Sequence, residues 1–299
     1  MANKCLATPY AQQAREILRL LRAKASDSEV QEQIDLIHEA ATEQGVMEPL
    51  VPSTDAYVTS VCLMGAKSLS HVLSCIDRYM ERLSSIGAAS EVARRQIITS
   101  VMDYWAEKPG IGVNIVDKLL NYTILTPMSV IEWALVDKLE RGEILAQAHI
   151  YEMIASTVFK VTNRVRQIVT ARNQKSLAAE QVALLDETLA KEKEQMKSLF
   201  MVLEDALRGV ADGSADAILE SRDQDEEPQA LLRGWGRKWL RVFRRKLAVE
   251  EAWIQETLAS ADLMYGNGED EDEDAANGME NGNEDGTAHA DVVDQEEVV

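Results

Sequence analysis

The sequence predicts an all-α protein built as an array of short helical hairpins, and three observations support this fold class. The 299 residues include only three Phe and six Pro, whereas Leu, Ala, Glu and Met recur in periodic segments. Residues 95–135 contain three short amphipathic patterns separated by two compact breaks. Helices this short cannot bury their apolar faces alone, so each must stack on its neighbours. We therefore expect an α-helical repeat, with HEAT-like helical hairpins stacked in an ARM-type superhelix.

Residues 95–135 carry the clearest helix signals. Ile98, Val101 and Trp105 are three and four residues apart, which places them on one helical face. We expect this helix to stop at residues 108–110 (Lys-Pro-Gly), because proline lacks an amide donor and restricts the residue before it. Thr126-Pro127 opens the third helix, since threonine is a favoured N-cap and proline is favoured at the first helical position.

The region before residue 95 shows similar helical periodicity. Two prolines within four residues predict that residues 45–52 form a loop, and the Ser-Thr-Asp run that follows offers an N-cap. Farther on, apolar residues recur from Leu69 to Leu83 at spacings of 4, 3, 4 and 3, as on one continuous helical face. We expect a first helix at residues 9–22, a second that begins at residue 26, and a third at 56–66 that is capped by residues 53–55. A fourth begins at residue 69 and is followed by a break at 87–90.

Longer helices are expected after Gly142. The first carries an apolar stripe at residues 144–168 and ends near Arg172. A heptad-like pattern over residues 182–206 then predicts a second helix. The pattern lasts less than four heptads and includes one Glu, which favours a packed antiparallel helix pair over an independent coiled coil.

The C-terminal part separates into a loop, a helix and a tail. Residues 211–228 are polar, acidic and aperiodic, so we expect a flexible surface loop before a last helix at 229–264. The formal charge is −20, but residues 266–299 contain thirteen acids and no Lys or Arg, which leaves about −7 for the rest. This low-complexity segment cannot bury enough apolar surface to offset its ordering entropy. We expect a helical-repeat domain at 1–265 and a disordered acidic tail at 266–299.

Cysteine usage and hydropathy indicate a reducing compartment and no membrane. Cys5, Cys62 and Cys75 are few, odd in number and without CxxC spacing, which favours reduced thiols in helical cores. No run approaches the 18 or more apolar residues of a membrane span, and the N-terminus lacks the apolar region of a signal peptide.

No constellation of residues indicates catalysis, a metal site or a bound cofactor. The four histidines are dispersed and match no Cys/His ligand spacing. Gly110 and Gly112 suggest a phosphate loop, but Ile115 occupies the third glycine position and a helix precedes the motif. His71 and Cys75 are four residues apart and could form a dyad, although no third orienting group is implied and ordinary helix packing is the favoured explanation.

One stretch has an unusual charge pattern. Residues 231–247 hold seven bases and no acid, together with an apolar stripe of Leu232, Trp235, Trp239, Val242, Phe243 and Leu247. An RNA-phosphate-contacting face, a membrane-surface helix and a docking face for an acidic partner are all compatible with it. So is a core-docked helix with a solvated basic back, the interpretation favoured by two tryptophans on one stripe. The candidate partner- or RNA-contacting residues are Arg237, Lys238, Arg241, Arg244 and Arg245.

An ordered series of segments resembles a known family. Residues 67–71 (KSLSH) start a helix, a helix ending in Trp105 and a Pro-containing turn follow, and then come 116–119 (VDKL) and 131–134 (IEWA). With the later segment 193–202 (KEQMKSLFMV), this series is similar to the C-terminal third of the large subunit of the nuclear cap-binding complex, in a fungal-like version.

The resemblance implies a scaffold rather than an enzyme. Members of this family consist of three helical-hairpin domains related to the middle domain of the eukaryotic translation-initiation scaffold, and this chain would supply only the last, as a fragment or truncated product. The family's large subunit holds a small RNA-recognition-motif subunit that binds the 7-methylguanosine cap, in nuclear RNA splicing, processing and export. Capped RNA would thus be contacted indirectly, and no cap-contacting residue is transferred to this chain.

Overall fold

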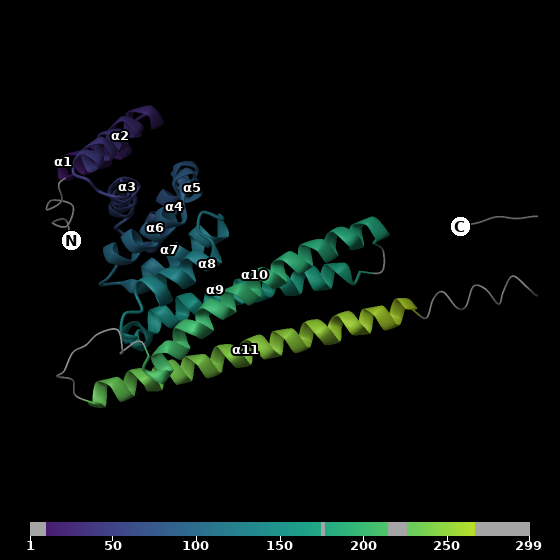
Figure 1. The fold of residues 1–299 in the computed structure, drawn as a ribbon. Coiled ribbons are helices and arrows are strands. Elements are labelled where there is room, and N and C mark those ends of the chain that lie inside the picture. Colours follow the sequence, from purple (N-terminus) through teal and green to yellow (C-terminus); the bar gives the residue numbers. More distant parts are fainter. Residues whose placement is uncertain (1–9, 175–176, 215–225, 267–299) are drawn as a thin grey trace, which may run out of the picture. The chain divides into compact units, whose positions relative to one another are not determined.

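The computed structural model describes residues 10–174, 177–214 and 226–266, and all regular secondary structure in these ranges is helical, which confirms the predicted class (Figure 1). Helices α1 to α10, and α11 as far as Ile254, belong to the first of two compact units, and the last turns of α11 belong to the second. The helices are α1 (Ala11–Ala23), α2 (Asp27–Glu43), α3 (Leu50–Met64), α4 (Leu69–Arg78), α5 (Met80–Ala89), α6 (Glu91–Tyr104), α7 (Pro109–Asn121), α8 (Pro127–Glu132), α9 (Ala148–Arg172), α10 (Ala179–Asp212) and α11 (Glu226–Gly266).

The helices of the first unit stack as successive neighbours. Helix α1 packs on α2 and α3, α3 packs on α6, and α6 packs on α7 and α8. Helices α7 and α8 in turn contact α9, which pairs with α10. Fully buried side chains mark this path, among them Tyr57 on α3, Ile98 on α6, Leu119 on α7 and Ile131 on α8. Each short helix thus buries its apolar face against the next, as expected for a helical repeat.

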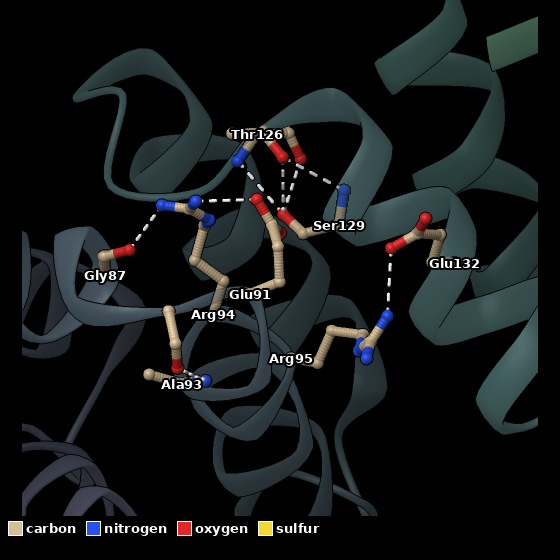
Figure 2. A network of polar contacts seen from close by, with 9 residues as sticks. Gly87, Glu91, Ala93, Arg94, Arg95, Thr126, Ser129 and Glu132 are labelled. Carbon is tan, nitrogen blue, oxygen red and sulfur yellow. Dashed lines mark hydrogen bonds and ion pairs between the residues drawn. The ribbon is translucent and has the colours of Figure 1, made fainter. Parts of the chain in front are cut away.

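The helix boundaries within residues 95–135 agree with the sequence signals. Trp105 follows the end of α6 and is only 5% exposed, and α7 begins at Pro109. The Thr126 Oγ1 accepts a hydrogen bond from the Ser129 amide (3.1 Å), and the Ser129 Oγ accepts one from the Thr126 amide (3.0 Å). These reciprocal bonds form a capping box that starts α8 (Figure 2).

Replacing the cap tests this assignment. Thr126→Ala leaves an amide of the first turn of α8 without its acceptor, so we expect the free energy of unfolding to fall by about 1 kcal/mol. Urea denaturation followed by circular dichroism measures the change. Thr170→Ala, at an exposed position within α9, is the control and should have an effect below about 0.5 kcal/mol. Equal losses from the two substitutions would contradict the capping role.

Two arginines of α6 join this helix to its neighbours (Figure 2). Arg94 donates to the Gly87 carbonyl at the end of α5 and forms an ion pair within its own helix. Arg95 binds Glu132 at the end of α8 (2.9 Å) and Asp137 (3.1 Å). Adjacent side chains of one helix therefore tie together three elements of the repeat.

The predicted loop at residues 45–52 is wrong in its last three residues, because α3 already begins at Leu50. Pro49 precedes the helix and Pro52 lies in its first turn. Amides of a first helical turn have no partner within the helix, so a proline there removes no hydrogen bond. The expected cap residues 53–55 consequently lie inside α3, where the Ser53 hydroxyl is 2.6 Å from a ring nitrogen of His38.

Other boundaries also differ from the predictions. The continuous face from residue 69 is split between α4 and α5 at Tyr79, whose hydroxyl donates to the Leu21 carbonyl at the end of α1 (2.9 Å). Residues at the expected 87–90 break remain helical to Ala89. After Gly142 comes a short 3₁₀ turn, and the long helix starts at Ala148. Residues 211, 212 and 226–228 of the expected loop are helical, while residues 215–225 lie outside the described residues. Of the predicted tail at 266–299, Gly266 is the last residue of α11, and 267–299 lie outside the described residues.

The predicted antiparallel pair is present as α9 and α10. Arg172 at the end of α9 binds Asp186 near the start of α10 (2.8 Å), and Arg164 approaches Glu192 (3.7 Å). As residue numbers decrease along α9, the numbers of the partner residues on α10 increase, so the two helices are antiparallel. Within the first unit, α11 forms ion pairs with both helices of this pair.

Candidate interaction surface on helix α11

Helix α11 is fastened to α9 by an aromatic cluster. Trp239 and Phe243 are buried, and the Tyr151 ring of α9 lies with its centroid 5.0 Å from that of Trp239 and 6.0 Å from that of Phe243. The core-docked helix predicted from the two-tryptophan stripe is therefore correct for these residues. Val242 of the same stripe is instead 41% exposed, while the neighbouring Leu240, which the sequence pattern omitted, is buried.

A buried carboxylate forms the second attachment between α11 and α9. Glu250 is 1% exposed and binds Arg166 of α9 (2.5 Å) and Lys246 of its own helix (2.6 Å). The Arg166 guanidinium also lies over the Trp253 ring, 4.5 Å from its centroid. Burial raises the pKa of the Glu250 carboxyl, but the hydrogen bonds from Arg166 and Lys246 outweigh it, so the net pKa is below its usual range.

The third attachment joins α11 to α10. Arg244 donates two hydrogen bonds to one oxygen of Glu204 (3.0 and 2.5 Å), and these bonds lower the pKa of the Glu204 carboxyl. A methyl group at Gly236 would lie 2.9 Å from the Ala211 backbone nitrogen, so glycine permits the close approach of α11 to the end of α10. Along α10 the contacts run from Glu204 to Ala211, whereas their partners on α11 run backwards from Arg244 to Gly236. The two helices are therefore antiparallel.

The five candidate basic residues therefore have different surroundings. Arg244 is held by Glu204, and the Lys238 ammonium lies over the half-buried Trp235 ring at 4.7 Å. Arg237, Arg241 and Arg245 are exposed, and none of them makes an ion pair within the part of the chain that the structure describes. These three, which we call the arginine row, are four residues apart and so lie along one side of the helix, opposite the buried face.

The histidine, cysteine and glycine positions considered for catalysis or phosphate binding have capping or packing contacts where the structure describes them. His71 lies 2.7 Å from the Ser68 hydroxyl that caps α4, and burial raises the pKa of the nearby Cys75 thiol, which disfavours a nucleophilic thiolate. Burial raises the pKa of Cys62 to about 12, whereas Cys5 lies outside the described residues. Gly112 is buried within α7 against Met102, so it belongs to helix packing.

A cleft elsewhere in the described ranges is lined partly by polar residues. A cleft of about 330 Å³ lies between α6 and the start of α9, with Asp103, Glu140 and Glu143 among its polar residues. Burial lowers the pKa of His149 at the edge of this cleft, which favours the neutral imidazole. Residues 10–174, 177–214 and 226–266 contain no group of three or more His, Cys, Asp and Glu side chains suited to a metal ion. No helix in these ranges is both long and apolar enough to cross a membrane.

Comparison with known proteins gives one family match and several curated relatives. The family model described as MIF4G like matches residues 6–252. Nuclear cap-binding protein subunit 1 of Schizosaccharomyces pombe is 22% identical over 172 residues, which cover 58% of this chain and 21% of that protein. The Anopheles gambiae protein of the same name is 26% identical over 140 residues, which cover 47% of this chain and 17% of that protein. The human protein is 22% identical over 172 residues, which cover 50% of this chain and 21% of that protein. The chain thus spans about a fifth of the length of these relatives.

Proposed function

The chain belongs to the MIF4G-like family, and from that premise we propose that it is a non-catalytic scaffold module of a nuclear cap-binding complex. The observation that carries the proposal is the family match over residues 6–252, which includes all of α1 to α10 and most of α11. The shared name of the curated relatives supports the same role. Stacked helices with rigid polar ties between them suit such a role, because a scaffold must present a fixed surface to its partners.

The proposed partner is a small RNA-recognition-motif subunit that binds the 7-methylguanosine cap of nuclear RNA. The chain would support cap binding through protein–protein contact, in mRNA processing, splicing and export, and would act in the nucleus. Its own residues would not touch the cap. Further processing and export factors would dock on the same scaffold.

Co-precipitation tests the partnership. The tagged full chain is incubated with the small RNA-recognition-motif subunit of the same organism, and retention is measured with and without the 7-methylguanosine dinucleotide. We expect the small subunit to be retained, and retention to rise with the cap analogue because scaffold and cap then favour the same ordered state. Absence of retention would overturn the proposal if it persists when the preceding region of a full-length relative is added as a separate polypeptide.

Direct binding of RNA phosphate by residues 231–247 is the alternative function. One observation favours it: the arginine row is exposed and makes no ion pair within the described residues. Against it, Trp239 is buried and Trp235 is half-buried beneath Lys238, so this stretch lacks the exposed rings on which bases stack. RNA contact by this face would rest on phosphate charge alone, and affinity would fall steeply with salt.

A further inference from the structure

Helix α11 carries a second pattern on its exposed side that the docking of its buried face does not explain. Leu231, Val242 and Val249 are 62%, 41% and 51% exposed, which is unusual for a helix that already buries a separate apolar stripe. These residues alternate with the exposed bases Lys238 and Arg245. With the half-buried Trp235 they recur at spacings of 4, 3, 4, 3 and 4, and we call this line the docking seam: Leu231, Trp235, Lys238, Val242, Arg245 and Val249.

The seam is bordered on both sides by groups that suit a partner. Arg237 and Arg241 of the arginine row lie along one side, without ion pairs in the described ranges. On the other side is α9, which runs parallel to α11 because Tyr151 meets Trp239 and Arg166 meets Glu250. Phe159 lies between these two contact points, two turns before Arg166 on the same side of α9, and is 59% exposed. Apolar groups from two helices are thus available beside a row of cations.

This combination indicates what kind of molecule fits. A 4-3 alternation on an exposed helix is the spacing by which a second helix packs in register. The seam from Leu231 to Val249 is about 27 Å long at 1.5 Å per residue, the length of a partner helix of five turns. The cations select a partner with carboxylates flanking its apolar stripe, since like charges would repel it. A polyanion without an apolar face would leave Val242, Val249 and Phe159 uncovered.

We propose that the docking seam binds an acidic amphipathic helix of another protein. Leucine-like side chains of that helix pack on Val242 and Val249, and its carboxylates pair with Arg241 and Arg245. The interaction adds to the proposed cap-binding role and does not depend on it, because the seam is made by this chain alone. A failure of this interaction would therefore leave the co-precipitation with the small subunit unaffected.

A synthetic helix tests the proposal. The probe is a fluorescent peptide of three heptads with leucine at the two seam-facing positions and glutamate beside them, titrated with the full chain and followed by anisotropy. We expect saturable binding to the wild-type chain. Both the Arg241→Glu/Arg245→Glu pair and the Val242→Asp/Val249→Asp pair should weaken it by at least about tenfold, because charge and apolar contact act together.

Matched controls separate the seam from general charge and surface effects. Arg15→Glu changes an exposed arginine of α1, and Leu184→Asp changes an exposed leucine of α10, so neither should alter binding more than about twofold. Circular dichroism verifies that every variant is folded. Lack of binding to the probe overturns the proposal. A second pattern of results would also overturn it. If the chain binds an oligouridine probe, the double arginine substitution weakens that binding, and the double valine substitution leaves peptide binding unchanged, the face is an RNA-phosphate surface.

Discussion

Trp239→Ala should lower the free energy of unfolding by about 3 to 5 kcal/mol, the largest loss that we expect from one substitution on α11. The ring is 2% exposed and packs against Tyr151 and Phe243, so its removal leaves a cavity between α9 and α11 and breaks up an aromatic cluster. Urea denaturation monitored by far-ultraviolet circular dichroism measures the loss. Part of the helical signal should melt at lower urea, since α11 loses its principal apolar attachment to the rest of the molecule.

Val242→Ala is the matched control for this prediction. Val242 belongs to the same helix and the same sequence stripe, but its side chain is 41% exposed, so truncation should cost less than about 0.5 kcal/mol. Similar losses for the two variants, or a loss below about 1 kcal/mol for Trp239→Ala, would show that α11 does not dock through its tryptophan face. Because Val242 is also part of the docking seam, Val242→Ala separates folding from partner binding.

The stripe on α11 shows how far periodicity leads and where it stops. Apolar spacing correctly placed Trp239 and Phe243 in the core, because a helix that packs on one side must repeat its apolar residues about every 3.6 positions. The same spacing wrongly grouped Val242 with them and omitted Leu240. A helix in the groove between two others buries a wide arc, and its edges depend on the partners' positions, which local sequence does not contain.

The charges on α11 are harder to predict than its apolar residues. Arg241, Arg244 and Arg245 are alike in sequence, yet among the described residues only Arg244 meets a carboxylate, that of Glu204, forty residues away along the chain. Which of several adjacent arginines is tied and which is free depends on how α10 crosses α11. The sequence therefore identified the basic face as a candidate surface, while its division into anchoring and exposed residues required the fold.

Local backbone signals were reliable for caps and less so for prolines and turns. The Thr126-Pro127 start was predictable because capping involves only neighbouring residues. The π-helical turn Trp133–Asp137 after α8 was not, since it lies beside Arg95 of another helix, which binds both Glu132 and Asp137. Pro52 led to the wrong prediction of a loop. A proline disrupts a helix interior but is tolerated in the first turn, and the sequence alone does not show that the helix starts at Leu50.

The buried carboxylate of Glu250 should give the second large effect. Glu250→Ala leaves Arg166 and Lys246 without their shared partner, and we expect a loss of about 3 kcal/mol at neutral pH. This is at the low end for breaking a buried ion pair, because both cations retain partial access to water. Glu250→Gln keeps the shape and one acceptor oxygen, so its loss should be smaller. Glu251→Gln, next to it but less buried, is the control.

The pH dependence distinguishes charge from packing at this site. The pKa of Glu250 in the folded protein is below its unfolded value of about 4.3, so its charged form stabilises the fold above that value. This contribution is lost as the pH falls through the folded pKa, because the carboxyl then takes up a proton and no longer attracts Arg166 and Lys246. Stability differences between the wild type and Glu250→Gln, measured by urea denaturation, should therefore be largest at neutral pH and shrink below about pH 4. A difference that stays constant over this range would mean that Glu250 acts through shape and hydrogen bonding, without a net contribution from its charge.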